Sequence, residues 1–309
     1  GIPKIPTPAI LITMKTFLSR LKALVFRYYY RFINARVWRD APPGRDVATS
    51  TLILPIDHRP IRARMYHGRE DHPIIIYFHG GGWVIGDLDT HDPFCRALVA
   101  ATDCTLMSVD YRLAPEYPFP AAHDDSFHAT RWILDNLNTL APNNGKAIIA
   151  GDSAGGNLAA CTLASMPEEP RLVGSILLYP ATEHYLHGFP SFSEHARSKP
   201  LTAPIMRWFV DTYMGDITPA DPAAKQVFLN RRTDYRDFPR SLIVTAERDV
   251  LRDDGRRLGI RMRQAGVDVT YHHYDDEAHG FACSEGPTAG HQHFISLASD
   301  WLKPFSTTP

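Results

Sequence analysis

A chain of 309 residues, 44% of them apolar, is long enough to bury one large hydrophobic core with a small accessory layer. Its 33 basic and 34 acidic side chains nearly cancel, which argues against nucleic acid as a partner and fits a small neutral substrate. The four cysteines stand far apart without metal-ligand spacing, so we expect no metal, no cofactor and no disulfide scaffold.

The N-terminal region lacks the apolar stretch and small-residue cleavage site of a secretory signal. Nowhere do about 18 apolar residues follow one another, as a membrane-spanning helix requires. We therefore expect no membrane span and a cytoplasmic location. A homodimer stays open.

Residues 11–32 predict an amphipathic helix. Its apolar side chains recur at a three-four spacing, namely Leu11, Met14, Leu18, Leu21, Val25, Tyr28 and Phe32. Basic residues such as Lys22 and Arg31 lie among them, so attachment to a membrane surface is one interpretation. Packing of the apolar face on the rest of the protein is the other, and we expect it because ordinary surface helices look much the same. The Pro42-Pro43-Gly44 break then ends this region.

After this break, strands and helices alternate. Short apolar runs bounded by turns predict strands at 51–54, 61–65, 74–78, 105–109, 147–150, 175–178, 242–246 and 267–271. Helical patterns follow at 125–137, 156–165, 255–264 and about 290–302. The alternation predicts an α/β fold with a mostly parallel central sheet flanked by helices, in which the first two strands could pair antiparallel at one edge.

Residues 183–229 interrupt the alternation. Several prolines and aromatic residues such as Trp208 and Phe209 indicate inserted helices and loops. Because ligands of open parallel sheets bind at the carboxyl ends of the strands, an insertion after one of those ends is placed to cover the site. We therefore expect a helical cap here.

The turn Gly151-Asp152-Ser153-Ala154-Gly155 directly follows a predicted strand and precedes a predicted helix. This context is what a nucleophile elbow requires, because the glycines allow a tight turn and the helix directs its N–H groups toward negative charge. The same five residues could occur by chance in a glycine-rich loop. Their strand-turn-helix position favours Ser153 as a nucleophile.

A second motif, from His79 to Trp83, follows the strand predicted at 74–78. Successive glycines leave backbone N–H groups unshielded, so the loop could close around the oxyanion of a tetrahedral intermediate. A flexible turn with a buried His79 is the simpler alternative. An oxyanion loop upstream of a nucleophile elbow is the order that a serine hydrolase needs, and together the two motifs predict one.

Serine needs a base, and the base needs an orienting acid. His279 lies in a loop after the strand predicted at 267–271, whereas His272 and His273 lie at the end of that strand and are expected to be structural. Asp249 follows the strand predicted at 242–246, and it is preferred to the other acids. Those rivals, Asp253 and Asp254, stand where acidic residues cap a helix. The order Ser153, Asp249, His279 is the one expected for this fold.

With these residues in place, the sequence resembles the hormone-sensitive-lipase-like family of α/β-hydrolases, in particular its GDSAGG subgroup of bacterial carboxylesterases and acetyl esterases. The matching segments run in the family's order and are 79–83, 86–91, 110–116, 151–157, 178–180, 249–253 and 279–281. One departure is Val250, where the family commonly has proline, and it bears on the stiffness of that loop.

The resemblance implies further roles. The backbone N–H groups of Gly81, Gly82 and Ala154 would bind the oxyanion, while His79 supports the loop. Asp152, next to Ser153, is expected to be a second supporting residue. It also implies that an N-terminal region of residues 1–48 and an insertion of residues 183–229 form the cap over a catalytic core of residues 49–182 and 230–309. The apolar face of the N-terminal helix would then cover the acyl pocket.

The sequence thus predicts a serine carboxylesterase that hydrolyses small-molecule, short-to-medium acyl esters through an acyl-enzyme intermediate. A non-catalytic small-molecule receptor of the same fold is one alternative, and an amide or acetamide hydrolase is another.

Overall fold

The structure is a computed structural model that describes residues 9–39, 44–56, 59–284 and 286–306. Within them, a central sheet of eight strands has the order β1-β2-β4-β3-β5-β6-β7-β8. The strands are Thr49–Leu54 (β1), Ile61–Tyr66 (β2), Ile74–Phe78 (β3), Leu106–Val109 (β4), Ala147–Asp152 (β5), Leu172–Leu178 (β6), Arg240–Arg248 (β7) and Val269–Ala278 (β8). Strand β2 runs antiparallel to β1 and β4, and the other neighbours are parallel. The predicted mostly parallel α/β sheet with an antiparallel edge is confirmed.

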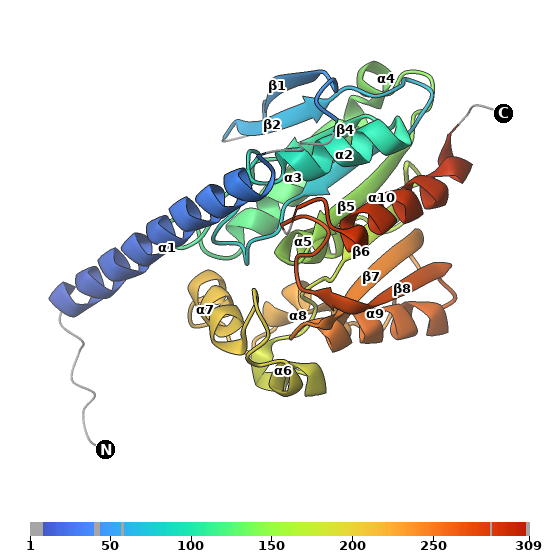
Figure 1. The fold of residues 1–309 in the computed structure, drawn as a ribbon. Coiled ribbons are helices and arrows are strands. Elements are labelled where there is room, and N and C mark those ends of the chain that lie inside the picture. The colour runs from blue at the N-terminus through green and yellow to red at the C-terminus, as the bar shows by residue number, and fades with distance from the viewer. Residues whose placement is uncertain (1–8, 40–43, 57–58, 285, 307–309) are drawn as a thin grey trace.

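Helices cover both faces of this sheet (Figure 1). The α-helices are Ala9–Val37 (α1), Asp92–Thr102 (α2), Ala121–Asp135 (α3), Leu137–Leu140 (α4), Ala154–Ala164 (α5), Pro190–Glu194 (α6), Ala203–Met214 (α7), Ala224–Val227 (α8), Arg252–Gln264 (α9) and Ala289–Leu302 (α10). Short 3₁₀ turns lie at Tyr185–His187 (η1), Leu229–Arg231 (η2) and Lys303–Phe305 (η3). Helices α2 and α10 pack together, whereas α3 packs on α5. The sequence prediction missed α2, although proline in its first turn is a typical helix start.

Two hydrophobic cores lie on opposite sides of the sheet, and strand β3 shows how one segment serves both. Ile74, Ile76 and Phe78 enter one cluster, and Ile75 and Tyr77 enter the other. Successive strand residues point to opposite faces of the sheet. All five side chains are fully buried, because both faces are covered. A continuous apolar run is therefore the pattern expected of a strand covered on both sides.

Helix α1 packs on the fold through a different face from the predicted one. Of the predicted set, Leu18, Leu21, Val25, Tyr28 and Phe32 are 47–76% exposed, and the side chains of Leu11 and Met14 lie outside the described part. The side that packs inward instead carries Ala23, Phe26, Tyr30 and Asn34. The expectation that the most apolar face is the buried face is therefore wrong.

A partly buried polar contact explains this orientation of α1. The guanidinium of Arg27 donates hydrogen bonds of 2.7 and 3.0 Å to the carboxylate of Glu116 and of 2.8 Å to the carbonyl oxygen of Val84. The spacing of apolar residues in the sequence gives no information on such polar contacts. The predicted break at Pro42-Pro43 lies outside the described residues.

The segment from 183 to 229 contains η1, α6, α7 and α8, and it lies beside α1 (Figure 1). The rings of Phe26 in α1 and Trp208 in α7 contact each other with centroids 4.9 Å apart. Among the helices described here, none is both long and apolar enough to span a bilayer. The predicted division of the chain into core and cap stays a prediction.

Candidate active site

Ser153 lies in a strained turn between β5 and α5. Its backbone has φ 56° and ψ −118°, a conformation that is unfavourable for a residue with a Cβ and is typical of functional sites. The turn also allows no side chain at its flanks: a Cβ on Gly155 would lie 1.9 Å from the carbonyl oxygen of Phe78. These two constraints present the hydroxyl of Ser153, which is 8% exposed, to the cavity at the end of the sheet.

His279 and Asp249 reach Ser153 from the two neighbouring strand ends, since Asp249 directly follows β7 and His279 directly follows β8. Oγ of Ser153 lies 2.9 Å from Nε2 of His279, and Nδ1 of His279 lies 2.7 Å from Oδ2 of Asp249. Nδ1–H of His279 donates a hydrogen bond to this carboxylate, so Nε2 is left to accept the serine proton. The three predicted side chains form one connected chain of hydrogen bonds.

The rival histidines lie elsewhere. The ring of His273 contacts the hydroxyl of Thr245 at 2.8 Å and the carboxylate of Glu247 at 3.0 Å. The ring of His272 packs against those of Tyr274 and His293. Both histidines belong to β8, upstream of the strand end that carries His279.

The rival acids bind backbone at the start of the inserted segment rather than at their own helix. Oδ2 of buried Asp254 accepts the N–H groups of Thr182 and Glu183, each at 2.8 Å, and Oδ2 of Asp253 accepts that of Ser191 at 3.0 Å. Helix α9 has no side-chain hydrogen bond at its N-cap. The interpretation of these two aspartates as helix caps is therefore wrong, because the backbone that they bind comes from a segment distant in sequence.

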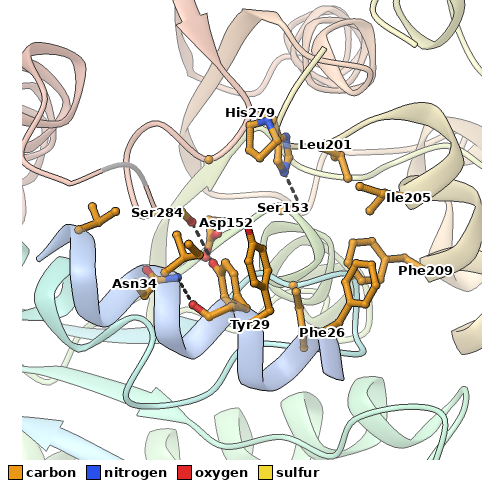
Figure 2. Close-up of a pocket in the computed structure, with 18 residues that line it drawn as sticks. Phe26, Tyr29, Asn34, Asp152, Ser153, Leu201, Ile205, Phe209, His279 and Ser284 are labelled. Atoms are coloured by element: carbon orange, nitrogen blue, oxygen red, sulfur yellow. Dashed lines mark hydrogen bonds between the residues drawn. The ribbon is translucent and has the colours of Figure 1, made fainter. Parts of the chain in front are cut away.

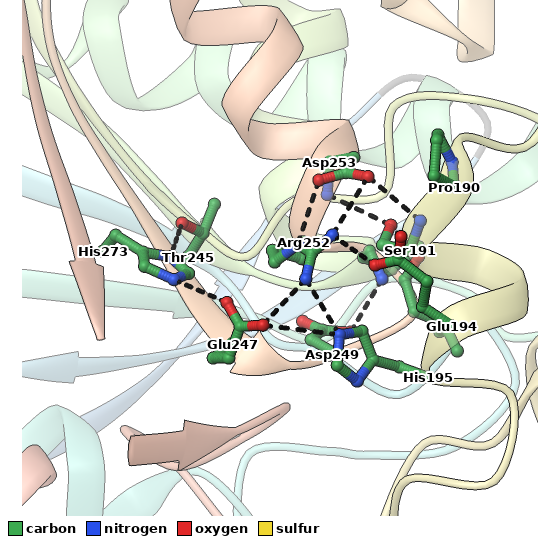
Figure 3. A network of polar contacts seen from close by, with 12 residues as sticks. Pro190, Ser191, Glu194, His195, Thr245, Glu247, Asp249, Arg252, Asp253 and His273 are labelled. Carbon is green, nitrogen blue, oxygen red and sulfur yellow. Dashed lines mark hydrogen bonds and ion pairs between the residues drawn. The ribbon is translucent and has the colours of Figure 1, made fainter. Parts of the chain in front are cut away.

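Arg252 links the same region to the strand end next to Asp249 (Figure 3). Its guanidinium donates to Glu194 at 2.7 Å, Glu247 at 2.8 Å and Asp253 at 3.0 Å, and it also contacts His195. Glu194 ends α6 and Glu247 belongs to β7. One cation thus joins the inserted segment to the strand that delivers Asp249.

The glycine loop after β3 closes over Ser153. Gly81 and Gly82 have φ of +120° and +58°, which L side chains rarely adopt. A Cβ on Gly82 would also lie 2.1 Å from Cγ of Phe209 in α7. Both glycines line the same cavity as Ser153, and Ala154 follows Ser153 as the first residue of α5, where a backbone N–H has no partner within the helix.

A buried polar cluster holds this loop from below. Oδ1 of Asp152 accepts the N–H of Gly80 at 2.7 Å and the phenol of Tyr77 at 2.6 Å, and it lies 3.4 Å from Nε2 of His91. Burial opposes the charge of Asp152, but His91 and these hydrogen bonds hold the pKa of its carboxyl below the ordinary value. Asp152 therefore connects the nucleophile turn to the glycine loop.

His79 lies beside this cluster. Its Nδ1–H donates to the carbonyl oxygen of Gly80 at 2.8 Å, its own carbonyl oxygen accepts the phenol of Tyr111 at 2.6 Å, and the two rings stack. Burial, together with His91, lowers the pKa of His79, which favours a neutral ring. The sequence prediction gave Tyr77, His91 and Tyr111 no role, although His91 and Tyr111 fall within the family-like segments.

A cavity of about 600 Å³ opens above Ser153 and His279. Figure 2 shows Phe26 and Tyr29 of α1 on one side of it, and Leu201, Ile205 and Phe209 on another. Its size lies within the usual range of small-molecule sites, and these walls are mostly apolar. Within the described residues, no group of three or more His, Cys, Asp or Glu side chains could hold a metal ion.

Comparisons with known proteins agree with this geometry. Residues 75–283 match the family model described as alpha/beta hydrolase fold. Esterase LipI of Mycobacterium tuberculosis is 38% identical over 230 residues, covering 72% of this chain and 71% of that protein, and carboxylesterase NlhH of the same organism is 39% identical over 216 residues, covering 69% and 67%.

Solved structures give the same result. The Pyrobaculum calidifontis esterase aligns with a TM-score of 0.83 at 32% identity, covering 91% of this chain and 92% of that one. The metagenomic carboxylesterase EstE1 aligns with a TM-score of 0.83 at 29% identity, covering 94% and 98%. These relatives confirm the predicted carboxylic ester hydrolase. The chain therefore belongs to the alpha/beta hydrolase fold family, as one of its hormone-sensitive-lipase-like carboxylesterases.

Proposed function

We propose that Ser153 is the nucleophile of this carboxylesterase, His279 its general base and Asp249 the acid that orients the imidazole. The observation that carries the proposal is the chain of hydrogen bonds from Ser153 to His279 and on to Asp249, at 2.9 and 2.7 Å. A hydroxyl becomes nucleophilic when a base within this distance removes its proton.

The reaction has two halves. Oγ of Ser153 attacks the ester carbonyl while His279 takes its proton, and the protonated imidazole then gives that proton to the departing alcohol. Water attacks the resulting acyl-enzyme while His279 takes its proton, and the imidazolium then gives that proton to Oγ of Ser153 as the bond to the acyl group breaks and the acid leaves. In both halves the N–H groups of Gly81, Gly82 and Ala154 stabilise the oxyanion. His79 and Asp152 support these donors from below, as their hydrogen bonds to Gly80 suggest.

Residues 1–48 and the insertion 183–229 serve as the cap over the catalytic core of residues 49–182 and 230–309. Side chains from α1 and from α7 line the same cavity, which supports this division. The cavity volume of about 600 Å³ suits short-to-medium acyl esters better than long ones. Rates over an ester series from acetate to palmitate would test this range, and a series that keeps rising to palmitate would contradict it.

Ser153→Ala tests the assignment of the nucleophile. It should lower kcat on a short p-nitrophenyl ester by roughly 10⁴- to 10⁶-fold and abolish labelling by a fluorophosphonate probe. Near-normal turnover by the purified variant would refute the proposal, and an unlabelled wild-type protein would favour the receptor alternative. Matched ester and amide substrates separate the esterase from an amide hydrolase.

His279→Ala tests the base, with His273→Ala as its matched control. The first should be nearly as damaging as Ser153→Ala, whereas the control should keep most of the activity. The predicted cytoplasmic location and the homodimer stay predictions.

A further inference from the structure

The outward face of α1 is apolar and exposed. Side chains on this face include Phe17, Leu21, Leu24, Tyr28 and Phe32, which are 47–76% exposed. At 100° per residue they fall along one side of the helix, opposite Phe26, Tyr30 and Ile33. Leu24, Tyr28 and Phe32, with two neighbours, surround a shallow apolar hollow. Large apolar patches of this kind mark contact surfaces.

The charged residues of α1 are all basic. Six of its 29 residues are Lys or Arg and none is Asp or Glu, although the whole chain is nearly neutral. On the helix, Arg20 and Arg31 flank one border of the apolar face, and Lys22 and Arg36 flank the other. All four are exposed, although Arg31 also pairs with Asp87 at 2.5 Å and Asp89 at 3.6 Å. The face therefore has an apolar centre and basic edges.

We propose that this face of α1 binds an anionic lipid surface. An exposed apolar strip that includes aromatic rings and has Lys and Arg at its borders has the chemistry of the boundary between acyl chains and negatively charged headgroups. A second copy of the chain is a poorer partner, because two such helices packed face to face would bring their basic residues together with no acid on either helix. The N-terminal end of α1 reaches beyond the other elements (Figure 1). The side chains of this face are exposed along the helix.

Lipid binding by α1 would place the catalytic cavity beside the lipid. The inward side of the helix forms one wall of that cavity, and Tyr29 lines both the cavity and the apolar hollow outside it. An apolar ester dissolved in the surface would therefore have a short path to Ser153. The proposal concerns binding, and it holds whichever side chain is the nucleophile.

The test uses the full chain and sedimentation with two kinds of vesicle: phosphatidylcholine alone, and an equimolar mixture of phosphatidylcholine and phosphatidylglycerol. Wild-type protein should sediment with the anionic vesicles and much less with the neutral ones. The triple variant Leu24→Gln, Tyr28→Gln and Phe32→Gln should bind the anionic vesicles on the order of 100-fold more weakly, because it removes three apolar contacts. Glutamine keeps the helix propensity high, and none of the three side chains lines the catalytic cavity.

A matched control exchanges exposed apolar side chains elsewhere. Ile53, Leu186 and Ile260 are 46–61% exposed, and the variant with glutamine at all three should bind vesicles as wild type does.

Arg20→Gln with Arg36→Gln should weaken binding to anionic vesicles about tenfold or more and leave the weak binding to neutral vesicles unchanged. All variants should hydrolyse a soluble acetate ester at the wild-type rate, which shows that the fold and the active site are intact.

Three results would overturn the proposal. The first is wild-type protein that binds neither kind of vesicle, and the second is a triple variant that binds as tightly as wild type. The third is a dimer in solution that dissociates in the triple variant while no vesicle is bound, since the face would then belong to an interface between copies of this chain. Loss of esterase activity by Ser153→Ala is independent of all three.

Discussion

The carboxylate of Asp152 and the backbone N–H of Gly80 lie 2.7 Å apart, so the residue before the proposed nucleophile holds the first glycine of the loop opposite it. A Cβ on Gly80 would lie 2.3 Å from Oδ2 of the same carboxylate, which leaves no room for adjustment. The positions of the turn with the proposed nucleophile and of the proposed oxyanion donors are therefore coupled through one side chain.

Asp152→Asn should lower kcat by roughly 10- to 100-fold and change KM little, because misplaced oxyanion donors weaken the transition state more than the bound ester. Asparagine presents a weaker, uncharged acceptor to Gly80 and Tyr77. Steady-state kinetics give kcat and KM separately. Tyr77→Phe, which removes one donor to the same oxygen, should have a smaller effect in the same direction. A variant that unfolds at lower temperature with kcat unchanged would reduce Asp152 to a structural role.

Gly82→Ala should be damaging for two separable reasons. The new methyl group would overlap the ring of Phe209, and alanine at φ +58° carries a backbone penalty of about 1–2 kcal/mol. The double variant with Phe209→Ala removes the overlap but not the backbone penalty. It should therefore recover part of the activity and of the thermal stability that Gly82→Ala loses, measured against Phe209→Ala alone. If neither activity nor thermal stability recovers, the backbone conformation alone accounts for the loss in Gly82→Ala.

The sequence predicted the elements that depend on local pattern. Turn glycines mark Ser153 and the loop of Gly81 and Gly82, and buried apolar runs mark the strands that present them. Side chains that act through distant partners escaped prediction. Asp254 looked like a helix cap because the N–H groups that it binds, at Thr182 and Glu183, lie more than 70 residues away.

The predicted buried face of helix α1 was wrong for a related reason. Its periodicity was recognised correctly, but an apolar stripe indicates that a face prefers to leave water and does not say what covers it. The ion pair of Arg27 with Glu116 and the contact of Phe26 with Trp208 determine the orientation, and neither is visible in the spacing of apolar residues.

Arg252→Gln should loosen the inserted segment. The guanidinium bridges Glu194 of α6 to Glu247 of β7 (Figure 3), and glutamine is too short to reach both. If the segment forms one wall of the cavity, KM for a short ester should rise several-fold, with a smaller change in kcat. Arg256→Gln, an exposed position one turn further along α9, is the matched control. Equal KM values in the two variants would show that the bridge does not act on the site.

Protonation of His123 should destabilise the fold in acid. Nδ1 of His123 lies 2.6 Å from the phenol of Tyr213 in α7, and its Nε2 is buried. Burial lowers the pKa of His123 from 6.5 to about 4. The unfolded chain therefore takes up the proton first as the pH falls. Neutral His123 therefore makes its full contribution to the free energy of unfolding above pH 6.5. That contribution declines as the pH falls from 6.5 to about 4, and up to roughly 3 kcal/mol is lost over this window.

His123→Gln should remove this part of the acid sensitivity, because glutamine does not titrate and its amide can still bond to Tyr213. Denaturant unfolding at a series of pH values across this window gives the free energy of unfolding and its slope against pH. The exposed His128, in the same helix α3, supplies the control variant His128→Gln. The slope should be shallower in His123→Gln than in the control. If the two variants share one slope, the contact between α3 and α7 is not the acid-labile point of the fold.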